Sequence, residues 1–136
     1  MPREIIRPPR GPAPAGSYSQ AVRAGDFVFV SGQIPMNPET GEVVFADVAE
    51  QTERILVNIR NILKVCGMGL EDVVKTTVYL ELMDDLARVN EVYGRFFGEN
   101  PPARAAVEVA RLPKDVAIEI EAVAYKGRGE EIIPSS

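Results

Sequence analysis

Histidine and tryptophan are absent from this chain of 136 residues, and cysteine occurs once, at Cys66. The lack of histidine excludes Ser-His-Asp and Cys-His activation of a nucleophile, and it removes the commonest zinc ligand. A lone cysteine cannot form an internal disulfide, which agrees with a reducing compartment, and we interpret Cys66 as a small core residue. Any catalysis must therefore use carboxylates, arginine, hydroxyls and backbone groups.

Long apolar runs and an excess of positive charge are also missing. No stretch approaches the roughly 18 consecutive apolar residues of a membrane span, and the N-terminus lacks the apolar run of a secretory signal. We therefore expect a soluble, cytoplasmic protein. The net charge of -5 argues against a nucleic-acid partner. Dinucleotide and P-loop glycine patterns and cysteine pairs are absent, so the sequence implies neither a cofactor nor a metal.

The length and the 46% hydrophobic content suit one core. We expect a single domain over residues 16–126. Four prolines between Arg7 and Pro14 remove backbone donors and fix φ, so we interpret residues 1–15 as an extended arm. Residues 127–136 are interpreted as a mobile tail.

Hydrophobic periodicity predicts alternating strand and helix segments along this domain. Strands at 18–24 and 27–30 flank a Gly25-Asp26 turn, which predicts a hairpin. A helix with Asp47 as its N-cap covers the region from 48 to 66, and a helix capped by Asp84 or Asp85 runs to about Phe97. Further strands are expected at 73–80, 103–109 and 116–125. This order predicts an α+β layer with both helices on one face of a sheet.

The last two strands yield a geometric prediction about charged residues. A hairpin centred on Leu112-Pro113 places Arg104 opposite Glu121, on a charged face that lies away from the core. One interpretation is an ordinary ion pair on a wet surface. The other is a site for a small carboxylate, because alanines on either side of Arg104 leave room beside the planar guanidinium.

Four further residues are candidates, each with a structural alternative. Ser31 and Gly32 follow an apolar strand, where they would either line a ligand site or form a simple turn. Tyr18 is either a polar group over a pocket or a half-buried strand aromatic. Asn90 lies on the apolar stripe of the second helix, so its amide would be buried and would either line a pocket or bond to nearby backbone.

Several short sequence motifs are also recognisable in the chain. The chain reads SQAV at 19–22, SGQIP at 31–35, QTERILVNIRN at 51–61 and DVVKTTV at 72–78. It then reads PARAAVEVARLPKD at 102–115 and IEIEA at 118–122. Over residues 16–125 the sequence closely resembles the RidA family, also called YjgF-type proteins.

The resemblance implies a chorismate-mutase-like α+β fold in a homotrimer, with three sites in the clefts between subunits. Carried over by position, each site comprises Tyr18, Ser31, Gly32, Asn90, Arg104 and Glu121. One departure matters, because many relatives have a cysteine two residues after the arginine and this chain has Ala106. A thiol-dependent activity at that position is therefore excluded.

The function implied by the resemblance is a 2-iminobutanoate/2-iminopropanoate deaminase without a cofactor. Its substrates derive from 2-aminoacrylate and 2-aminocrotonate, and its products are 2-keto acids and ammonia. Arg104 would bind the carboxylate and Glu121 would activate water. Tyr18 and Ser31 would orient water or substrate. Gly32 and Asn90 would line the substrate site. The first alternative is a non-catalytic trimer that binds keto acids or amino acids, and the second is an endoribonuclease or translation inhibitor.

Overall fold

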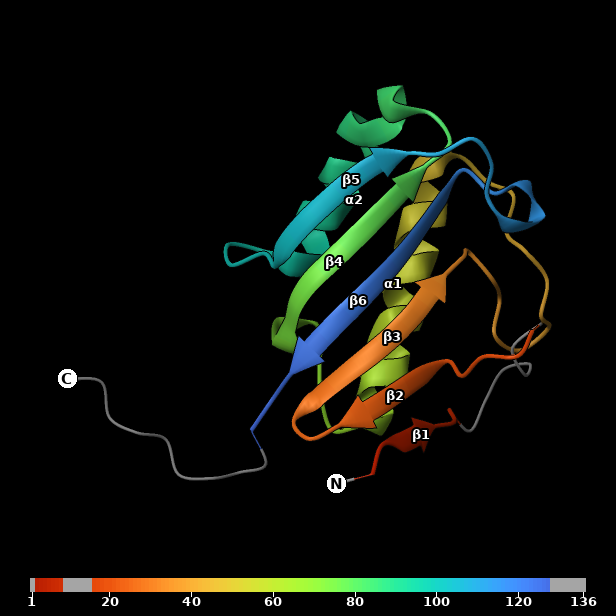
Figure 1. Cartoon of the computed structure of the whole chain (residues 1–136). Coiled ribbons are helices and arrows are strands. Elements are labelled where there is room, and N and C mark those ends of the chain that lie inside the picture. The colour runs from red at the N-terminus through yellow and green to blue at the C-terminus, as the bar shows by residue number, and fades with distance from the viewer. Residues whose placement is uncertain (1, 9–15, 128–136) are drawn as a thin grey trace.

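Six strands of the computed structural model, which describes residues 2–8 and 16–127, form one mixed sheet in the order β1-β2-β3-β6-β4-β5 (Figure 1). The strands are β1 (Glu4–Ile6), β2 (Ala21–Ala24), β3 (Phe27–Gln33), β4 (Val73–Leu80), β5 (Ala103–Glu108) and β6 (Ile118–Tyr125). The helices are α1 (Val48–Val65) and α2 (Leu86–Phe97), with short 3-10 turns at Leu70–Asp72, Met83–Asp85 and Pro113–Asp115. All paired strands are antiparallel except β4 and β5.

The expected N-terminal arm begins as part of the sheet. Glu4–Ile6 forms β1 and pairs with β2, and the side chain of Ile6 is buried. A strand of three residues is too short to show a period, so the sequence analysis did not find it. The rest of the predicted arm, at 9–15, and nearly all of the predicted tail, at 128–136, lie outside the described residues.

The predicted hairpin at Gly25-Asp26 is confirmed, since Ala24 pairs with Phe27 across it. Gly25 has a φ of 61°, which a residue without a Cβ adopts at little cost. The second strand is longer than predicted, because β3 continues through Ser31 and Gly32 to Gln33, with a register shift against β6 after Val30. Ser31 and Gly32 therefore lie inside an irregular strand and not in a turn after it.

The two helices start differently. The Asp47 side chain accepts a hydrogen bond of 2.9 Å from the Glu50 amide, which confirms the predicted cap of α1. Asp85 makes no such bond, and the Glu108 carboxylate accepts 2.8 Å from the Met83 amide in the turn that leads into α2. Asp85 therefore stands at the predicted N-cap position of α2, but its side chain does not cap the helix. Neither described helix is long and apolar enough to cross a membrane.

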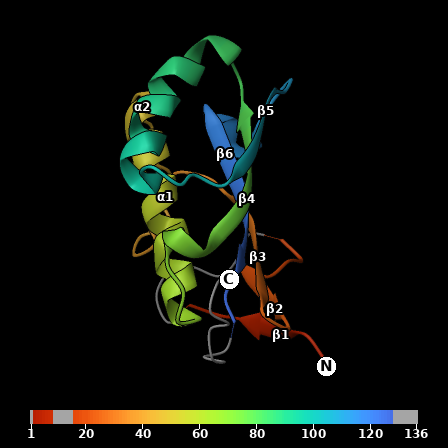
Figure 2. The same ribbon diagram turned by 90° about the vertical axis from the view of Figure 1, so that its left-hand side faces the viewer.

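Both helices pack on the same face of the sheet, as Figure 2 shows from the side. The core forms where apolar positions of β4 and β6 meet the buried stripes of the helices. Its fully buried large side chains include Ile55, Leu56, Ile59, Leu63, Val78, Leu80, Val89, Ile118 and Ile120. The predicted α+β class, a mixed sheet with two helices on one face, is confirmed.

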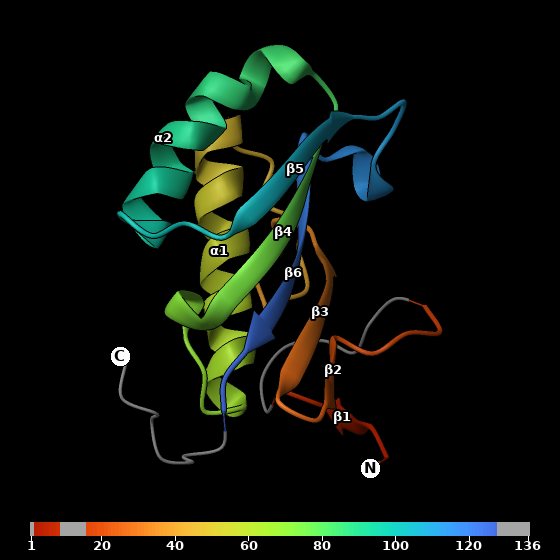
Figure 3. The same cartoon turned by 60° about the vertical axis from the view of Figure 1, so that its left-hand side comes forward.

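The predicted hairpin of the last two strands is wrong. β5 pairs in parallel with β4, with Arg104 beside Thr76, whereas β6 lies between β3 and β4 (Figure 3). The chain makes a β4-α2-β5 crossover, so β5 becomes the sheet edge on the far side of β4. The alternation predicted for β6 is correct, since Ile118 and Ile120 are buried.

The sheet face opposite the helices is open and carries aromatic side chains. The Phe27 ring centroid lies 4.9 Å from that of Tyr125 and 6.2 Å from that of Phe29. All of these rings are exposed in the single chain. Contiguous exposed apolar groups of this kind are typical of surfaces that bind other molecules.

Candidate functional site

Arg104 lies on the edge strand β5, with its guanidinium against α2. Its Nη1 donates a hydrogen bond of 2.7 Å to Asn90 Oδ1, and its Cζ lies 4.9 Å from the ring centroid of Tyr93. Among the described residues the guanidinium forms no ion pair with a carboxylate. Most of its N–H donors therefore stay available to an incoming anion.

Asn90 differs from its prediction in one respect. Its side chain is exposed and not buried, because α2 turns Val89 and Val92 into the core at this point. The amide oxygen is engaged by Arg104. Asn90 therefore holds the arginine through a neutral group, which leaves the positive charge uncompensated.

A second group of polar side chains forms around β3 and β6. Ser31 Oγ donates a hydrogen bond of 2.6 Å to the carbonyl of Ser19, which ties the segment containing Tyr18 to β3. Tyr18 itself is 51% exposed. Gly32 lies directly against the carboxylate of Glu119, and a Cβ at this position would collide with it. Because the atoms met are the end of a flexible side chain, a larger residue at this position would displace the Glu119 carboxylate.

The Glu119 carboxyl is half-buried in this second group. Burial, and to a smaller extent the charge of Glu121, raises the pKa of Glu119 above its ordinary value. A half-buried acid with a raised pKa is a candidate for proton transfer. Glu119 is a functional candidate that the sequence analysis missed, although a glycine within an apolar strand signals that another group comes close.

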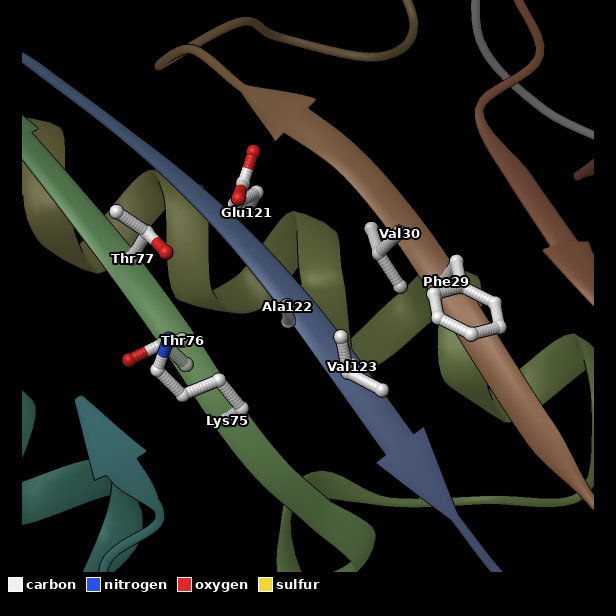
Figure 4. Close-up of a pocket in the computed structure, with 8 residues that line it drawn as sticks. All are labelled: Phe29, Val30, Lys75, Thr76, Thr77, Glu121, Ala122 and Val123. Carbon is white, nitrogen blue, oxygen red and sulfur yellow. The ribbon is translucent and has the colours of Figure 1, made fainter. Parts of the chain in front are cut away.

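Glu121 lies one step further along β6, on the open face. It pairs with Thr77 in the sheet and lines a shallow hollow of about 270 Å³ (Figure 4). The residues around this hollow are Phe29, Val30, Lys75, Thr76, Thr77, Glu121, Ala122 and Val123. Burial, followed by the charge of Glu121, raises the pKa of the neighbouring Tyr79 hydroxyl.

Arg104 and Glu121 do not meet within one chain. Thr76, the sheet partner of Arg104, is buried on the helix side, and Thr77, the partner of Glu121, points the opposite way because strand side chains alternate. With β4 between them, β5 and β6 are also two strand spacings apart, about 10 Å. The chain thus brings Arg104 and Asn90 together, and separately Ser31, Gly32 and the glutamates.

Ala106 follows Arg104 on the same side of β5. It aligns with the buried Val78 and packs partly against the core, so no reactive group stands beside the guanidinium at this position. Within the described part of the chain, no cluster of three or more acidic, histidine or cysteine side chains is arranged to hold a metal ion. The chemistry on offer is anion binding by Arg104 and proton transfer by a carboxyl.

Comparison with known proteins identifies the family to which the chain is similar. The profile of the family described as Endoribonuclease L-PSP matches residues 9–126. A RutC family protein of Pyrococcus abyssi is 57% identical over 126 residues, which cover 93% of this chain and 99% of that protein.

Two solved structures have the same fold. RidA from the Antarctic bacterium Psychrobacter sp. gives a TM-score of 0.86 at 42% identity, covering 90% of this chain and 99% of that one. E. coli TdcF, solved with bound serine, gives 0.85 at 45% identity, covering 91% and 99%.

Proposed function

Since this chain belongs to the Endoribonuclease L-PSP family, which includes the RidA and YjgF-type proteins, we propose that it is a 2-iminobutanoate/2-iminopropanoate deaminase. It hydrolyses the imine tautomers of 2-aminoacrylate and 2-aminocrotonate to 2-keto acids and ammonia. The observation that carries the proposal is the guanidinium of Arg104, which is fixed by an amide and a ring but paired with no acid of the described chain.

Arg104 binds the substrate carboxylate through paired N–H donors. A carboxylate matches the fork of a guanidinium, and two charge-assisted hydrogen bonds fix the anion in orientation as well as position. The imine carbon, one bond away from the carboxylate, is then held at a defined point. Positioning of this kind supplies much of the rate increase needed for a reaction that already proceeds in water.

A second copy of the chain supplies the acid. Because Arg104 and the glutamates point to opposite faces of one sheet, a complete site needs the β5 edge of one copy against the β3–β6 face of another. The exposed rings of Phe27, Phe29 and Tyr125 favour such packing of the open face. We therefore propose the chorismate-mutase-like homotrimer, with one site in each cleft between subunits.

Glu119 is the preferred proton-transfer group, with Glu121 as the neighbouring alternative. The carboxylate takes a proton from water as the oxygen attacks the imine carbon, and the nitrogen is protonated, directly or by relay through the same carboxyl. The resulting carbinolamine loses ammonia as its hydroxyl becomes the keto group. We assign the orientation of this water to Tyr18 and Ser31, because Ser31 adjoins Gly32 and its hydroxyl donates to the carbonyl of Ser19, next to Tyr18.

This reaction requires no cofactor or metal, and a cytoplasmic location fits the reactive metabolites it removes. Ribonuclease activity is the less favoured reading, because the chain has no histidine and a net charge of -5. The proposed partners are therefore small 2-imino and 2-keto acids and further copies of the same chain.

A coupled assay tests the proposal. Imine is generated freshly by an amino-acid oxidase or dehydratase, and keto-acid and ammonia release are compared with the rate in buffer. We expect acceleration by the wild type and a loss of about 100-fold in kcat/KM for Arg104→Ala, which removes two charge-assisted hydrogen bonds. The matched control is Arg111→Ala, since Arg111 is exposed and paired with Asp115 at 3.0 Å, away from β5.

The outcomes separate the alternatives. If the protein binds pyruvate only when Arg104 is present and yet does not accelerate imine loss, that result would support the binding or regulatory trimer. Cleavage of RNA with no effect on imines would support the ribonuclease alternative. Either result contradicts the deaminase proposal.

A further inference from the structure

Tyr93 contacts both the central strand β4 and the guanidinium of Arg104. Its side chain is only 5% exposed, and its hydroxyl lies 2.7 Å from Thr76 Oγ1 on β4, a residue that is 1% exposed. The face of the same ring contacts Arg104, whose Cζ lies 4.9 Å from the ring centroid. One buried side chain therefore spans the distance from the central sheet to the exposed cation.

The orientation of this contact suits anion binding. A guanidinium over a ring face is attracted by the quadrupole of the ring, and the Arg104 Cζ stands over the ring of Tyr93. Hydrogen bonds leave a guanidinium in its own plane, so the ring does not compete for the N–H groups. Asn90 accepts a hydrogen bond of 2.7 Å from Nη1, and the guanidinium forms no other hydrogen bond with the described residues.

The Thr76 contact sets how the ring lies. Thr76 is the parallel sheet partner of Arg104, so the same position in β4 that aligns with the arginine also anchors the ring beneath it. Burial, the largest effect, raises the pKa of the Tyr93 hydroxyl above its ordinary value, with smaller opposing effects from Thr76 and Arg104. The phenol is consequently neutral at physiological pH and acts as a ring and not as a counter-ion.

We propose that Tyr93 is a positioning residue of the anion site, and that Thr76 fixes the tilt of the Tyr93 ring and, through it, the plane of the Arg104 guanidinium. The inference rests on the proposed function in taking the anion to be the carboxylate of the imino acid. The placement of the guanidinium itself is independent of that function and can be measured separately.

The test combines imine kinetics, pyruvate titration and NMR of the Arg104 Nε–H group in the assembled protein. The ring current of Tyr93 shifts this resonance, which is assigned by its loss in Arg104→Lys. Tyr93→Leu removes the ring, and Tyr93→Phe and Thr76→Val each remove only the hydroxyl contact. Phe96→Leu is the matched control, since Phe96 lies on the same helix beneath a different cation, with its ring centroid 5.7 Å from Arg60 Cζ.

We expect Tyr93→Leu to raise KM and the pyruvate Kd about three- to tenfold, the range of a cation–π contact, and to abolish the ring-current shift. Tyr93→Phe and Thr76→Val should each raise KM about two- to threefold, and the double variant should be no worse than either, because all three lose the same bond. In each case kcat should stay near the wild-type value, since the carboxylate is bound equally in the ground and transition states. Phe96→Leu should change neither KM nor the resonance.

A merely structural role for Tyr93 would lower the active fraction, and hence the apparent kcat, while leaving KM unchanged. That result, or an unaltered Arg104 resonance in Thr76→Val and Tyr93→Phe, would overturn the inference. These two variants barely change side-chain volume, so they decide the matter even where Tyr93→Leu does not fold. Absence of imine turnover in the wild type would count against the proposed function alone, because the resonance still reports the placement of Arg104.

Discussion

Two inactive variants should restore activity when they are mixed. In one chain Arg104 projects to the helix side of the sheet and Glu119 to the open side, with β4 between their strands. Each site must then take its arginine from one copy and its acid from another. Arg104→Ala supplies an intact acid, and Glu119→Gln supplies an intact arginine, so a mixed assembly contains some sites with both groups.

The size of the recovery follows from counting. When equal amounts of the two variants assemble at random, half of the arginine positions and half of the acid positions are intact. About a quarter of the sites in any cyclic assembly therefore have both residues, and about a quarter of wild-type activity should return. A site contained within one chain would give no recovery, since every chain lacks one of the two residues.

The assay unfolds the two variants together in denaturant and refolds them by dilution, with refolded wild type as the reference. Imine turnover is measured, and native mass spectrometry establishes that mixed oligomers have formed. If Glu119→Gln is active by itself, whereas Glu121→Gln is inactive and recovers activity when mixed with Arg104→Ala, the catalytic role belongs to Glu121. Mixed oligomers that remain inactive in both pairings would refute the shared site.

Three further results are expected from single variants. The pKa of Glu119 is raised above its ordinary 4.5 in the folded chain, so the protonated carboxyl stabilises the fold relative to the unfolded chain. This contribution to the free energy of unfolding is complete below pH 4.5 and is lost as the pH rises through the pKa of the folded state. Glu119→Gln should therefore show a higher Tm than wild type at pH 7 and an equal Tm near pH 4, by scanning calorimetry; an advantage at pH 4 would contradict this. Gly32→Ala should displace the flexible Glu119 carboxylate, lowering kcat roughly 10- to 100-fold with little change in Tm, whereas unchanged kcat would show that this contact is unimportant. Ile120→Ala, in the middle of β6, should cost about 2–5 kcal/mol in urea unfolding, against about 0.5 kcal/mol or less for the exposed Val65→Ala; equal costs would be inconsistent with the described core.

Local features of the fold were predictable because neighbouring residues determine them. Gly25-Asp26 specifies the first hairpin, and the Asp47 cap starts α1 where the apolar stripe begins. The alternation of β6 also depends only on that strand, with Ile120 buried and Glu121 exposed. These elements follow from turn chemistry, capping and period.

The neighbours of β5 were not predictable from the short loop that follows it. A loop of this length suggests a hairpin, yet β6 is bonded on both sides by β3 and β4, which leaves no free edge for β5. The stretch of strand, helix and strand from Val73 to Glu108 does contain the signal of a parallel crossover, and weighing it above the loop would have placed β5 beside β4. Arg104 was consequently assigned to the wrong face.

The site was predictable in part for the same reason. Arg104 and Asn90, both predicted site residues, are hydrogen-bonded to each other. Gly32 lies close to another group, the Glu119 carboxylate. Glu119 and Tyr93 escaped notice because their importance lies in what they touch across the sheet. A contact such as that between Tyr93 and Thr76 depends on the packing of α2 over β4, which no local pattern encodes.

The central position of β6 has a consequence for synthesis of the protein. The strand comes after all the others in the chain, yet it joins β3 to β4, so residues 118–125 connect two otherwise separate half-sheets. Until residues 118–125 emerge from the ribosome, each half-sheet of the nascent chain has an unpaired edge strand, and the buried side chains of β6 are missing from the core. Folding to completion must therefore await the end of translation of this strand, and a message cut short before it would encode an aggregation-prone product.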